Sequence, residues 1–488
     1  MASSRLDEIR SLRLDKLANL KKLGVNPYPS KFTPPPDHPH LPVSAARLNH
    51  GQIVSVAGRL WKLRSHGQLT FADLKDASGQ IQLLFQSSEL SDKYELLKLL
   101  DAGDFLGVTG RIITTQAGEI TVSVASFQLL TKALRPLPDD WYGLKDIEDR
   151  YRKRYLDLLI NPEVKKRFVT RSRLVKEIRL YLDRLGYQEV ETPTLQSLYG
   201  GANAKPFKTH VNSLNTDIYL RIADELYLKR LLVSDMEKVF EICKDFRNEG
   251  FDQTHHPEFT MIEYYECYAD YHRIMDVTEG LFKHLATAVL GSAPLQVGNH
   301  QVDISHPWPR VTMTDAIMDQ LGLDVAKSSA SQLAEFAQSH KIPLLGGDSA
   351  GQLIFTIFEH LVTDKLIDPV WIINYPSAVS PLAKSIPGQP DWVERFEGYI
   401  GGKEICDGWS ELTDPTEQRA RFEFDTQAAR KDQEEAQKVD EDFLEAMEYG
   451  LPPIGGIGIG IDRLTMFFTN TWSIKEVILF PLLRPDQQ

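Results

Sequence analysis

Glycine alternates with isoleucine over residues 456–461, and an arginine, Arg463, follows two residues later. Because successive side chains of a strand point to opposite faces, Gly456, Gly458 and Gly460 would leave one face bare while the isoleucines anchor the other in a core. A bare face lets a flat ligand lie against the backbone, and a guanidinium is a forked, permanently charged donor that suits a phosphate. The pattern predicts a nucleotide site. A glycine-bearing core strand is the alternative.

A second set of candidate side chains flanks the loop of a predicted antiparallel hairpin within residues 238–265. Counting by two groups them on one face of each strand: Arg247 and Glu249 on the first, and Phe259, Met261, Glu263 and Tyr265 on the return strand. That face combines a cation for phosphate, an aromatic platform and carboxylates. In the loop, His255 is predicted to donate to phosphates. Adjacent histidines such as His255 and His256 cannot both reach one ion from a regular element, so zinc is not favoured.

Carboxylates dominate a third segment, residues 395–412. Glu397 and Glu404 are predicted to hold Mg²⁺ between the oxygens of ATP, because this ion takes one or two carboxylates together with substrate phosphates. Asp407 and Glu411 would make the neighbouring pocket acidic. Since no Lys or Arg stands between Glu404 and Glu411, the segment predicts a cationic ligand. An exposed charged strand is the alternative, against which the glycines and apolar residues of the segment argue.

Length and composition bound the rest of the molecule. The chain has 488 residues, too many for one ordinary core, and its net charge of −13 argues against indiscriminate nucleic-acid binding. No apolar stretch is long enough to cross a bilayer and no secretory segment begins the chain, so a cytoplasmic protein is expected. The three cysteines, Cys243, Cys267 and Cys406, lack C-x-x-C spacing and are expected to be free thiols.

The first part of the chain is predicted to be a helix followed by a small barrel. The basic, amphipathic helix would start at a capping box of Ser4 and Asp7, stop at Gly24, and either contact RNA or cover a neighbouring element. After a proline-rich linker, short strands are predicted at residues 54–59, 68–73, 80–85, 104–110 and 119–124, with a helical segment at 91–100. Five strands with one interposed helix is the order of a Greek-key barrel of the oligonucleotide-binding (OB) kind.

The second part is predicted to be a larger domain with both helices and strands. A long helix is expected at residues 164–185, and a helix-rich stretch from about 312 interrupts the strands until they resume at Trp371. We therefore expect three regions: residues 1–35 as helix and linker, 36–138 as the barrel domain, and 139–488 as the larger domain with a helical insertion at about 312–368.

Three motifs occur in a set order along the chain: residues 186–193 ending on Pro193, residues 246–259 around Arg247, and residues 458–463. Together with residues 219–230 they make nearly the whole chain similar to the class II lysyl-tRNA synthetases of the bacterial type. The resemblance implies an α+β fold, with an N-terminal five-stranded OB-type barrel that binds the anticodon. It also implies a class II catalytic domain built on an antiparallel sheet flanked by helices, and a homodimer whose interface forms around Pro193.

The resemblance also implies a role for each candidate residue. ATP would be bound by Arg247, Glu249, His255, Phe259, Glu404 and Arg463, of which Arg247, Glu404 and Arg463 would be catalytic. Lysine would be bound by Gly201, Glu225, Glu263, Tyr265, Asp407 and Glu411. Mg²⁺ would be the cofactor, on Glu397 and Glu404. The anticodon of tRNA(Lys) would contact Arg64, Phe71, Gln82 and Glu119. The implied enzyme activates L-lysine with ATP to lysyl-adenylate and transfers lysine to the 3′ end of tRNA(Lys).

The chain departs from the family pattern at Asp407 and His256, where Asn is usual, at Asp224, where Pro is usual, and in residues 431–438. Asp407 bears on the substrate, because the Asn that it replaces lies near the substrate carboxylate. We expect lysine to remain the substrate, with Asp407 tolerated through a shifted pKa or an added donor. The alternatives are a class II enzyme for another amine, an aspartyl or asparaginyl enzyme, a paralogue that lysylates a protein, and a non-catalytic RNA-binding paralogue.

Overall fold

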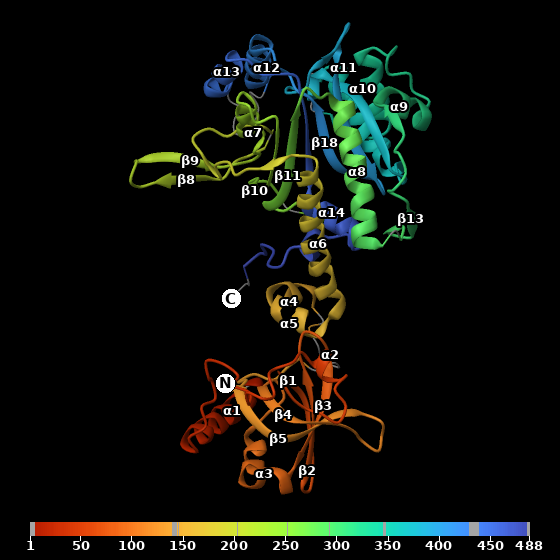
Figure 1. The fold of residues 1–488 in the computed structure, drawn as a ribbon. Coiled ribbons are helices and arrows are strands. Elements are labelled where there is room, and N and C mark those ends of the chain that lie inside the picture. Colours follow the sequence, from red (N-terminus) through yellow and green to blue (C-terminus); the bar gives the residue numbers. More distant parts are fainter. Residues whose placement is uncertain are drawn as a thin grey trace. The chain divides into compact units, whose positions relative to one another are not determined.

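The structure, a computed structural model, describes residues 5–138, 144, 146–202, 204–250, 252–291, 293–344, 348–428 and 439–485. Contacts divide the chain into two compact units, Met1–Lys145 and Asp146–Gln488 (Figure 1). Ser4 of the predicted cap and the departing segment 431–438 lie outside the described residues.

The first unit contains a closed five-stranded barrel in the order β1-β2-β3-β5-β4. Its strands are β1 (Ile53–His66), β2 (Leu69–Lys75), β3 (Gln80–Gln86), β4 (Phe105–Thr114) and β5 (Ile120–Thr131). β3 pairs with β5 in parallel, and the other neighbours pair antiparallel. The predicted five-stranded barrel is thus confirmed. The predicted helical segment is a short turn, α3 (Ser87–Leu90), followed by a 3-10 helix, η1 (Ser91–Leu99); a further short helix, α2 (Val43–Ala46), precedes β1.

The N-terminal helix α1 (Arg5–Lys22) packs on the barrel through two of its basic residues. Arg13 is buried, and its guanidinium donates to the carbonyl oxygens of Ala133, Arg135 and Ala102 at 3.1, 2.9 and 3.0 Å. Lys16 Nζ lies 2.7 Å from an Asp101 carboxylate oxygen. Of the two roles expected for this helix, covering a neighbouring element accounts for Arg13 and Lys16.

The second unit is built on a largely antiparallel sheet with the order β14-β15-β17-β18-β19-β11-β10-β6, to which β16 adds beside β17. These strands are β6 (Gln188–Glu189), β10 (Lys238–Phe246), β11 (Glu258–Cys267), β14 (Arg310–Thr312), β15 (Val370–Pro376), β16 (Ser385–Ile386), β17 (Gln389–Ile400), β18 (Lys403–Ser410) and β19 (Ile454–Gly460). Smaller sheets are formed by β7 (Leu195–Gln196), β8 (Lys208–Val211) and β9 (Thr216–Leu220), and by β12 (Leu295–Val297) and β13 (His300–Val302).

Helices flank this sheet, as the predicted fold class requires (Figure 1). The helices of this unit are α4 (Ile147–Arg152), α5 (Arg154–Ile160), α6 (Pro162–Arg184), α7 (Glu225–Leu232), α8 (Tyr271–Leu290), α9 (Met313–Leu321), α10 (Ala330–Ser339), α11 (Ala350–Leu361), α12 (Pro415–Ala428), α13 (Glu441–Glu448) and α14 (Ile461–Phe468), with short 3-10 turns η2 (Thr363–Lys365), η3 (Ser377–Val379) and η4 (Ile474–Glu476). Helices α9, α10 and α11 come between β14 and β15 in the sequence. They share a hydrophobic core with β15 and β17.

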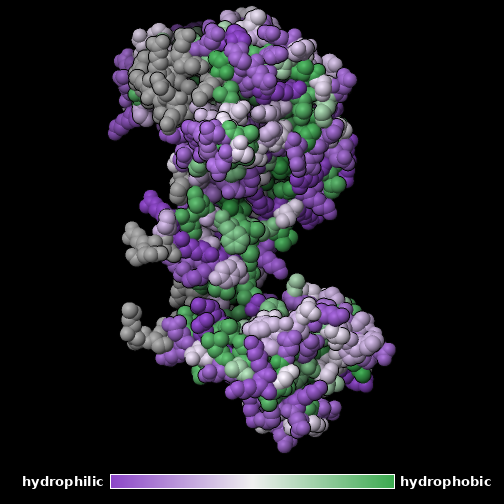
Figure 2. Space-filling model, turned by 90° about the vertical axis from the view of Figure 1, so that its left-hand side faces the viewer, coloured by the Kyte–Doolittle hydropathy of each residue, from purple (hydrophilic) through white to green (hydrophobic). Residues whose placement is uncertain are grey.

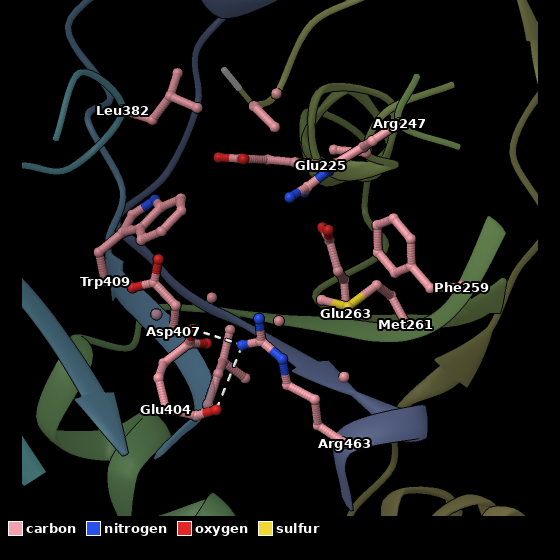
Figure 3. A pocket seen from close by; sticks show the side chains of 18 of the residues that line it. Glu225, Arg247, Phe259, Met261, Glu263, Leu382, Glu404, Asp407, Trp409 and Arg463 are labelled. Atoms are coloured by element: carbon pink, nitrogen blue, oxygen red, sulfur yellow. Dashed lines mark hydrogen bonds and ion pairs between the residues drawn. The ribbon is translucent and has the colours of Figure 1, made fainter. Parts of the chain in front are cut away.

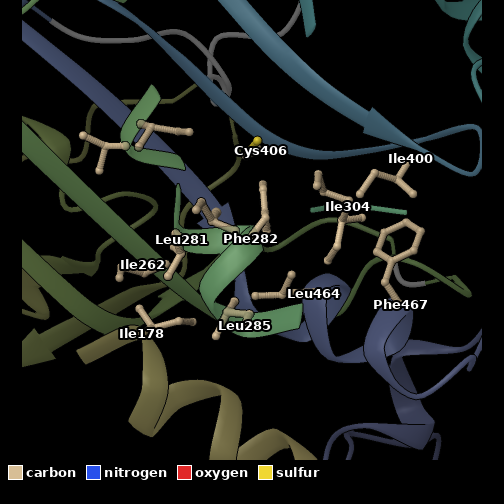
Figure 4. Close-up of a cluster of buried hydrophobic side chains, with 14 of the residues drawn as sticks. Ile178, Ile262, Leu281, Phe282, Leu285, Ile304, Ile400, Cys406, Leu464 and Phe467 are labelled. Atoms are coloured by element: carbon tan, nitrogen blue, oxygen red, sulfur yellow. The ribbon is translucent and has the colours of Figure 1, made fainter. Parts of the chain in front are cut away.

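The alternating glycines and isoleucines form β19, in the middle of the sheet. Ile457 and Ile459 are buried in the largest hydrophobic cluster together with Leu281 and Phe282 of α8 (Figure 4). This confirms that the isoleucine face of the strand anchors in a core. Because that face is held by packing, the glycine face is left to the opposite side of the sheet.

One local prediction is wrong. Counting by two had placed Arg247 and Glu249 on the first strand of the hairpin, but β10 ends at Phe246 and both residues lie in the loop beyond it. The return strand β11 carries Phe259 and Glu263 as predicted. An alternating pattern cannot mark where the hydrogen-bonded ladder stops, because the last paired residue depends on the partner strand.

The polarity of the surface and the state of the cysteine thiols match the expectations from composition. In Figure 2, hydrophilic side chains cover most of the visible face, with apolar ones scattered among them. Within the described ranges, no helix combines the length and apolar character needed to span a bilayer. Cys243, Cys267 and Cys406 are free and buried, as predicted.

Candidate active site

The bare strand β19 lies between two strands that bring functional side chains to it. Across one edge, Gly458 pairs with Glu263 and Gly456 with Tyr265 of β11. Across the other edge, Gly458 pairs with Asp407 of β18. A side chain could not replace Gly456, because a Cβ there would come within 2.3 Å of the Tyr265 ring. The glycines thus form the floor of a cavity of about 430 Å³.

Arg247 and Arg463 reach into this same cavity, from the hairpin loop and from the first turn of α14 (Figure 3). Arg463 Nη1 lies 2.8 Å from a carboxylate oxygen of Glu404, and Arg463 Nη2 lies 3.2 Å from His255 Nε2. The Arg247 guanidinium lies 5.1 Å from the centre of the Phe259 ring. Two fixed positive charges and an aromatic face are therefore presented to one ligand.

His255 is held in a single tautomer by its two neighbours. Arg463 can only donate, so His255 Nε2 accepts from it and Nδ1 carries the proton that faces Asp252, 3.1 Å away. Burial alone would raise the pKa of Asp252, but hydrogen bonds from the Thr254 backbone and from His255 lower it to about 2. His255 and the exposed Glu249 both line the cavity.

The six residues predicted to bind lysine all line the cavity: Gly201, Glu225, Glu263, Tyr265, Asp407 and Glu411. Tyr265 donates to Glu263 at 2.7 Å. Gly201 has a positive φ of 86°, and a Cβ there would lie 3.4 Å from that of Glu225. Glu225, Glu263 and Glu411 are buried, so carboxyl groups line this end of the cavity.

Lys229, on α7, is a residue that the sequence reasoning missed. Its buried ammonium lies 2.5 Å from Glu225 and also contacts Glu411. Only one oxygen of Glu411 is used, by Lys229 and by the Trp409 indole at 2.8 Å; the other finds no partner among the described residues. Burial, opposed by Lys229, raises the pKa of Glu411 to about 8. The i, i+4 spacing of Glu225 and Lys229 on a helix was the available signal.

Asp407 is paired with an arginine from the neighbouring strand. Arg395 of β17 donates from Nε and Nη2 to the two oxygens of Asp407, each at 2.9 Å, and from Nη2 to Glu397 at 2.7 Å. Burial raises the pKa of Asp407 to about 6 although Arg395 opposes the rise. Residues 404–411 contain no Lys or Arg, as counted, but the folded chain brings two cations to them from other elements, Arg395 from β17 and Lys229 from α7.

The two residues predicted to bind Mg²⁺, Glu404 and Glu397, differ in how accessible their carboxylate oxygens are to an ion. Glu404 is partly exposed and lines both the first cavity and a second one of about 410 Å³, so its carboxylate is open to a ligand. Glu397 lines only the second cavity. Its oxygens accept from Arg395 at 2.7 Å and from Tyr399 at 2.5 Å, and burial raises its pKa to about 7. The donor set fits a hard cation at Glu404 better than at Glu397.

Three of the four predicted anticodon residues share the outer face of the barrel. Arg64 pairs with Phe71 across β1 and β2, and Gln82 pairs with Asp73 two residues further on, so these side chains point the same way. Glu119 is exposed immediately before β5, where Thr121 bonds Gln82 at 2.9 Å. The barrel thus offers an aromatic ring beside polar side chains.

His256 and Pro193 have surroundings unlike those of the residues described above. His256 lines the cavity but bonds to backbone groups, and Pro193 does not line the cavity. His256 is buried; its Nδ1 lies 2.6 Å from the carbonyl oxygen of Glu258, and its Nε2 accepts from the backbone N–H of Leu482 at 2.9 Å. It therefore fastens the C-terminal segment to the hairpin loop. Pro193 is exposed in the segment that leads into β7, beside the exposed side chain of Leu195.

Known proteins match the chain over nearly its whole length. The family of class II tRNA synthetases (D, K and N) matches residues 146–484, and the OB-fold nucleic acid binding domain matches residues 54–130. A lysine–tRNA ligase of Carboxydothermus hydrogenoformans is 47% identical over 99% of this chain and 100% of its own length. That of Bacillus subtilis is 45% identical over 98% of both chains. Lysine–tRNA ligase 2 of Methanosarcina mazei is 47% identical over 97% of this chain and 94% of its own.

The match confirms the predicted resemblance in both units, since each family covers the unit in which its fold was found. The cavity geometry and these similarities agree, and the chain belongs to the class II aminoacyl-tRNA synthetases, within the family of the lysine–tRNA ligases.

Proposed function

We propose that the protein activates L-lysine with ATP and transfers the lysyl group to the 3′ end of tRNA(Lys). The observation that carries this proposal is a single cavity in which Arg247 and Arg463 face one end and Glu225, Glu263 and Glu411 are buried at the other. A triphosphate suits the first end, and a dibasic amino acid suits the second. The names of the similar proteins support the same reaction.

The chemistry needs positioning and charge stabilisation, and no side-chain nucleophile. The carboxylate of lysine attacks the α-phosphorus of ATP and pyrophosphate leaves; a hydroxyl of the terminal ribose of tRNA then takes the lysyl group from the lysyl-adenylate, and AMP leaves. Arg247 and Arg463 are placed to meet charge on the transferring phosphoryl group. Phe259 and Arg463 would enclose the adenine of ATP. Glu249 would hold the base, and His255 would hold the phosphates.

We assign the cofactor Mg²⁺ chiefly to Glu404. This ion would neutralise charge on the phosphates, and Glu404 offers an accessible carboxylate beside Arg463. Glu397 would join only by sharing oxygens that Arg395 and Tyr399 already use. At the other end, Glu225 and Gly201 would take the α-amino group of lysine, while Glu263, Tyr265 and Glu411 would surround its ε-ammonium.

Pyrophosphate exchange with ATP, measured with each of the twenty amino acids, tests the activation step. Exchange with lysine alone, followed by charging of tRNA with a lysine anticodon, is the expected result. Exchange only with aspartate or asparagine would indicate a related synthetase of that specificity. Exchange with none would indicate a non-catalytic RNA-binding paralogue.

Asp407→Asn is expected to keep lysine as the substrate. The asparagine oxygen still accepts from Arg395, so the change should cost less than about 1.5 kcal/mol, or about tenfold in kcat/KM for lysine. Lysine-dependent exchange measures this. If the wild-type chain were inactive with lysine and Asp407→Asn gained that activity, the natural substrate would be another amine.

Phe71→Ala is expected to weaken tRNA charging without affecting lysine activation. Stacking of a base on an aromatic ring contributes about 1–3 kcal/mol, so KM for tRNA should rise about 5- to 150-fold. The matched control is Tyr28→Ala, which removes a half-exposed aromatic of the same unit from outside β2 and β3. An equal effect of both variants would remove Phe71 from the anticodon site.

We also propose a cytoplasmic homodimer. Pro193 and the neighbouring Leu195, of which 53% is exposed, would lie in its interface. A mass in solution equal to one chain at micromolar concentration would contradict the dimer.

A further inference from the structure

Asp224 is a buried carboxyl group that neither a hydrogen-bond donor nor a cation among the described residues contacts. It precedes α7 as its N-cap residue, yet its side chain makes no capping hydrogen bond. Its exposed fraction is 0%, and within the described part of the chain its oxygens meet no donor group, only the carboxyl of Glu263 at hydrogen-bond distance. Burying an ionised carboxylate in this way costs several kcal/mol, so its charge must be removed or matched.

The charged and titratable groups around Asp224 come from every element packed against it. They are Arg221 before α7, Glu225 and Lys229 on α7, Glu241, Cys243 and Asp245 on β10, Arg247 beyond β10, and Glu263 and Tyr265 on β11. Carboxylate oxygens of Asp224, Asp245 and Glu263 all lie within 4.8 Å of one another.

Two of the three cations in this set, Arg221 and Lys229, are paired with other carboxylates, and the third, Arg247, lines the cavity. Arg221 lies 2.7 Å from Glu241 and 3.4 Å from Asp245. Lys229 bridges Glu225 and Glu411. Among the described residues, this leaves Asp224 and Glu263 as two adjacent carboxyl groups that no salt bridge reaches, with only the Tyr265 hydroxyl donating to Glu263 at 2.7 Å.

Two adjacent buried carboxyls resist ionising together, so at least one of them holds a proton. Burial, followed by the charge of Glu263, raises the pKa of Asp224 well above its ordinary value. Burial, followed by the charge of Glu225, raises the pKa of Glu263 to about 8. Asp224 is fully buried and does not line the cavity, whereas Glu263 does.

A divalent cation is the other way to satisfy three such carboxylates. It would, however, place two positive charges on Glu263, the group proposed to receive the ε-ammonium of lysine. The two cations would then repel each other at contact distance. A proton satisfies Asp224 without this conflict.

We propose that Asp224 is held as a neutral carboxylic acid that donates a hydrogen bond to Glu263, and that binding of the lysine ε-ammonium to Glu263 expels the proton of Glu263 to solvent. Asp224 is thereby a positioning residue for lysine. It holds Glu263 in place through a bond that survives when Glu263 ionises. The inference rests on the proposed lysine-binding role of Glu263.

Titration of the full-length chain with lysine, in buffers of different ionisation enthalpy, counts the protons released on binding. At pH 7 we expect about one to two protons per lysine, because the pKa of Glu411 is also raised to about 8 and its carboxyl is proposed to face the same ammonium. Glu263→Gln should release about one proton fewer than the wild-type chain. No proton release at pH 7 would overturn the proposal. The measurement on the wild-type chain does not depend on whether a substituted chain folds.

Two substitutions of Asp224 test whether this side chain acts as a neutral hydrogen-bond donor or as a negative charge. Asp224→Asn retains a donor without a charge, and KM for lysine at pH 7 should stay within about threefold of wild type. Asp224→Ala removes the donor and should raise KM for lysine about tenfold, with kcat and KM for ATP unchanged. Equal damage by both variants, or lysine binding that depends on added Zn²⁺ or Mn²⁺, would overturn the proposal.

Glu263→Gln keeps this inference distinct from the proposed function. If Glu263→Gln leaves KM for lysine unchanged, the proposed role of Glu263 fails. If it raises KM while the wild-type chain releases no proton, Glu263 binds lysine and only the inference about Asp224 fails.

Discussion

Arg463→Ala is expected to reduce lysine-dependent pyrophosphate exchange about 10²- to 10³-fold. Removing one preorganised donor from a developing charge costs about 3–4 kcal/mol. The loss here also frees Glu404 and His255, which Arg463 holds at 2.8 and 3.2 Å. The fall should appear in kcat/KM for ATP, measured at saturating lysine.

The matched control for this prediction is Arg419→Ala. Arg419 on α12 makes an exposed ion pair with Glu441, so its loss should leave exchange unchanged. Arg463→Lys should recover only part of the activity, because an ammonium cannot reproduce the planar fork of the guanidinium. Exchange by Arg463→Ala within tenfold of wild type would remove this residue from the catalytic machinery.

Lys229→Met is expected to destabilise the second unit by about 3–5 kcal/mol at pH 7. The substitution keeps the volume but leaves Glu225 and Glu411 buried without their shared cation, and breaking a buried pair from one side costs this much. Urea unfolding should show a lower midpoint with an unchanged slope.

The control for Lys229→Met is Lys327→Met, which removes an exposed lysine paired with Asp324 and should leave the midpoint unchanged. Adding Glu225→Gln to Lys229→Met should recover part of the loss, because one uncompensated charge disappears. A midpoint for Lys229→Met equal to that of wild type would mean that Glu225 and Glu411 are already neutral in the folded chain.

Local patterns predicted much of this site. The glycine face of β19 is visible in the sequence because strand periodicity is a local property, and a strand with one bare face must find its core on the other. The same reasoning placed Phe259 and Glu263 on one face of β11, where both now line the cavity. It misplaced Arg247, because the end of β10 is set by pairing between strands.

The charges opposite the predicted carboxylates could not be read from their own segments. Arg395 reaches Asp407 from the next strand, and Lys229 reaches Glu411 across 182 positions of sequence, from a helix to the end of a strand. A count of charges within residues 404–411 therefore described an uncompensated acidic segment that does not exist in the folded chain.

The sequence by itself predicted the five-stranded barrel, the glycine-lined strand and the three motifs, and the resemblance carried by these motifs proposed the residues for ATP and lysine. Periodicity and motif order suffice for these, since each depends on neighbours along the chain. Only the tertiary structure decided which carboxylates are paired with a cation, Glu411 with Lys229 and Asp407 with Arg395, and which have no salt bridge among the described residues, Glu263 and Asp224. Charge compensation in a buried site depends on distances of a few ångströms between distant elements, and these are set by packing.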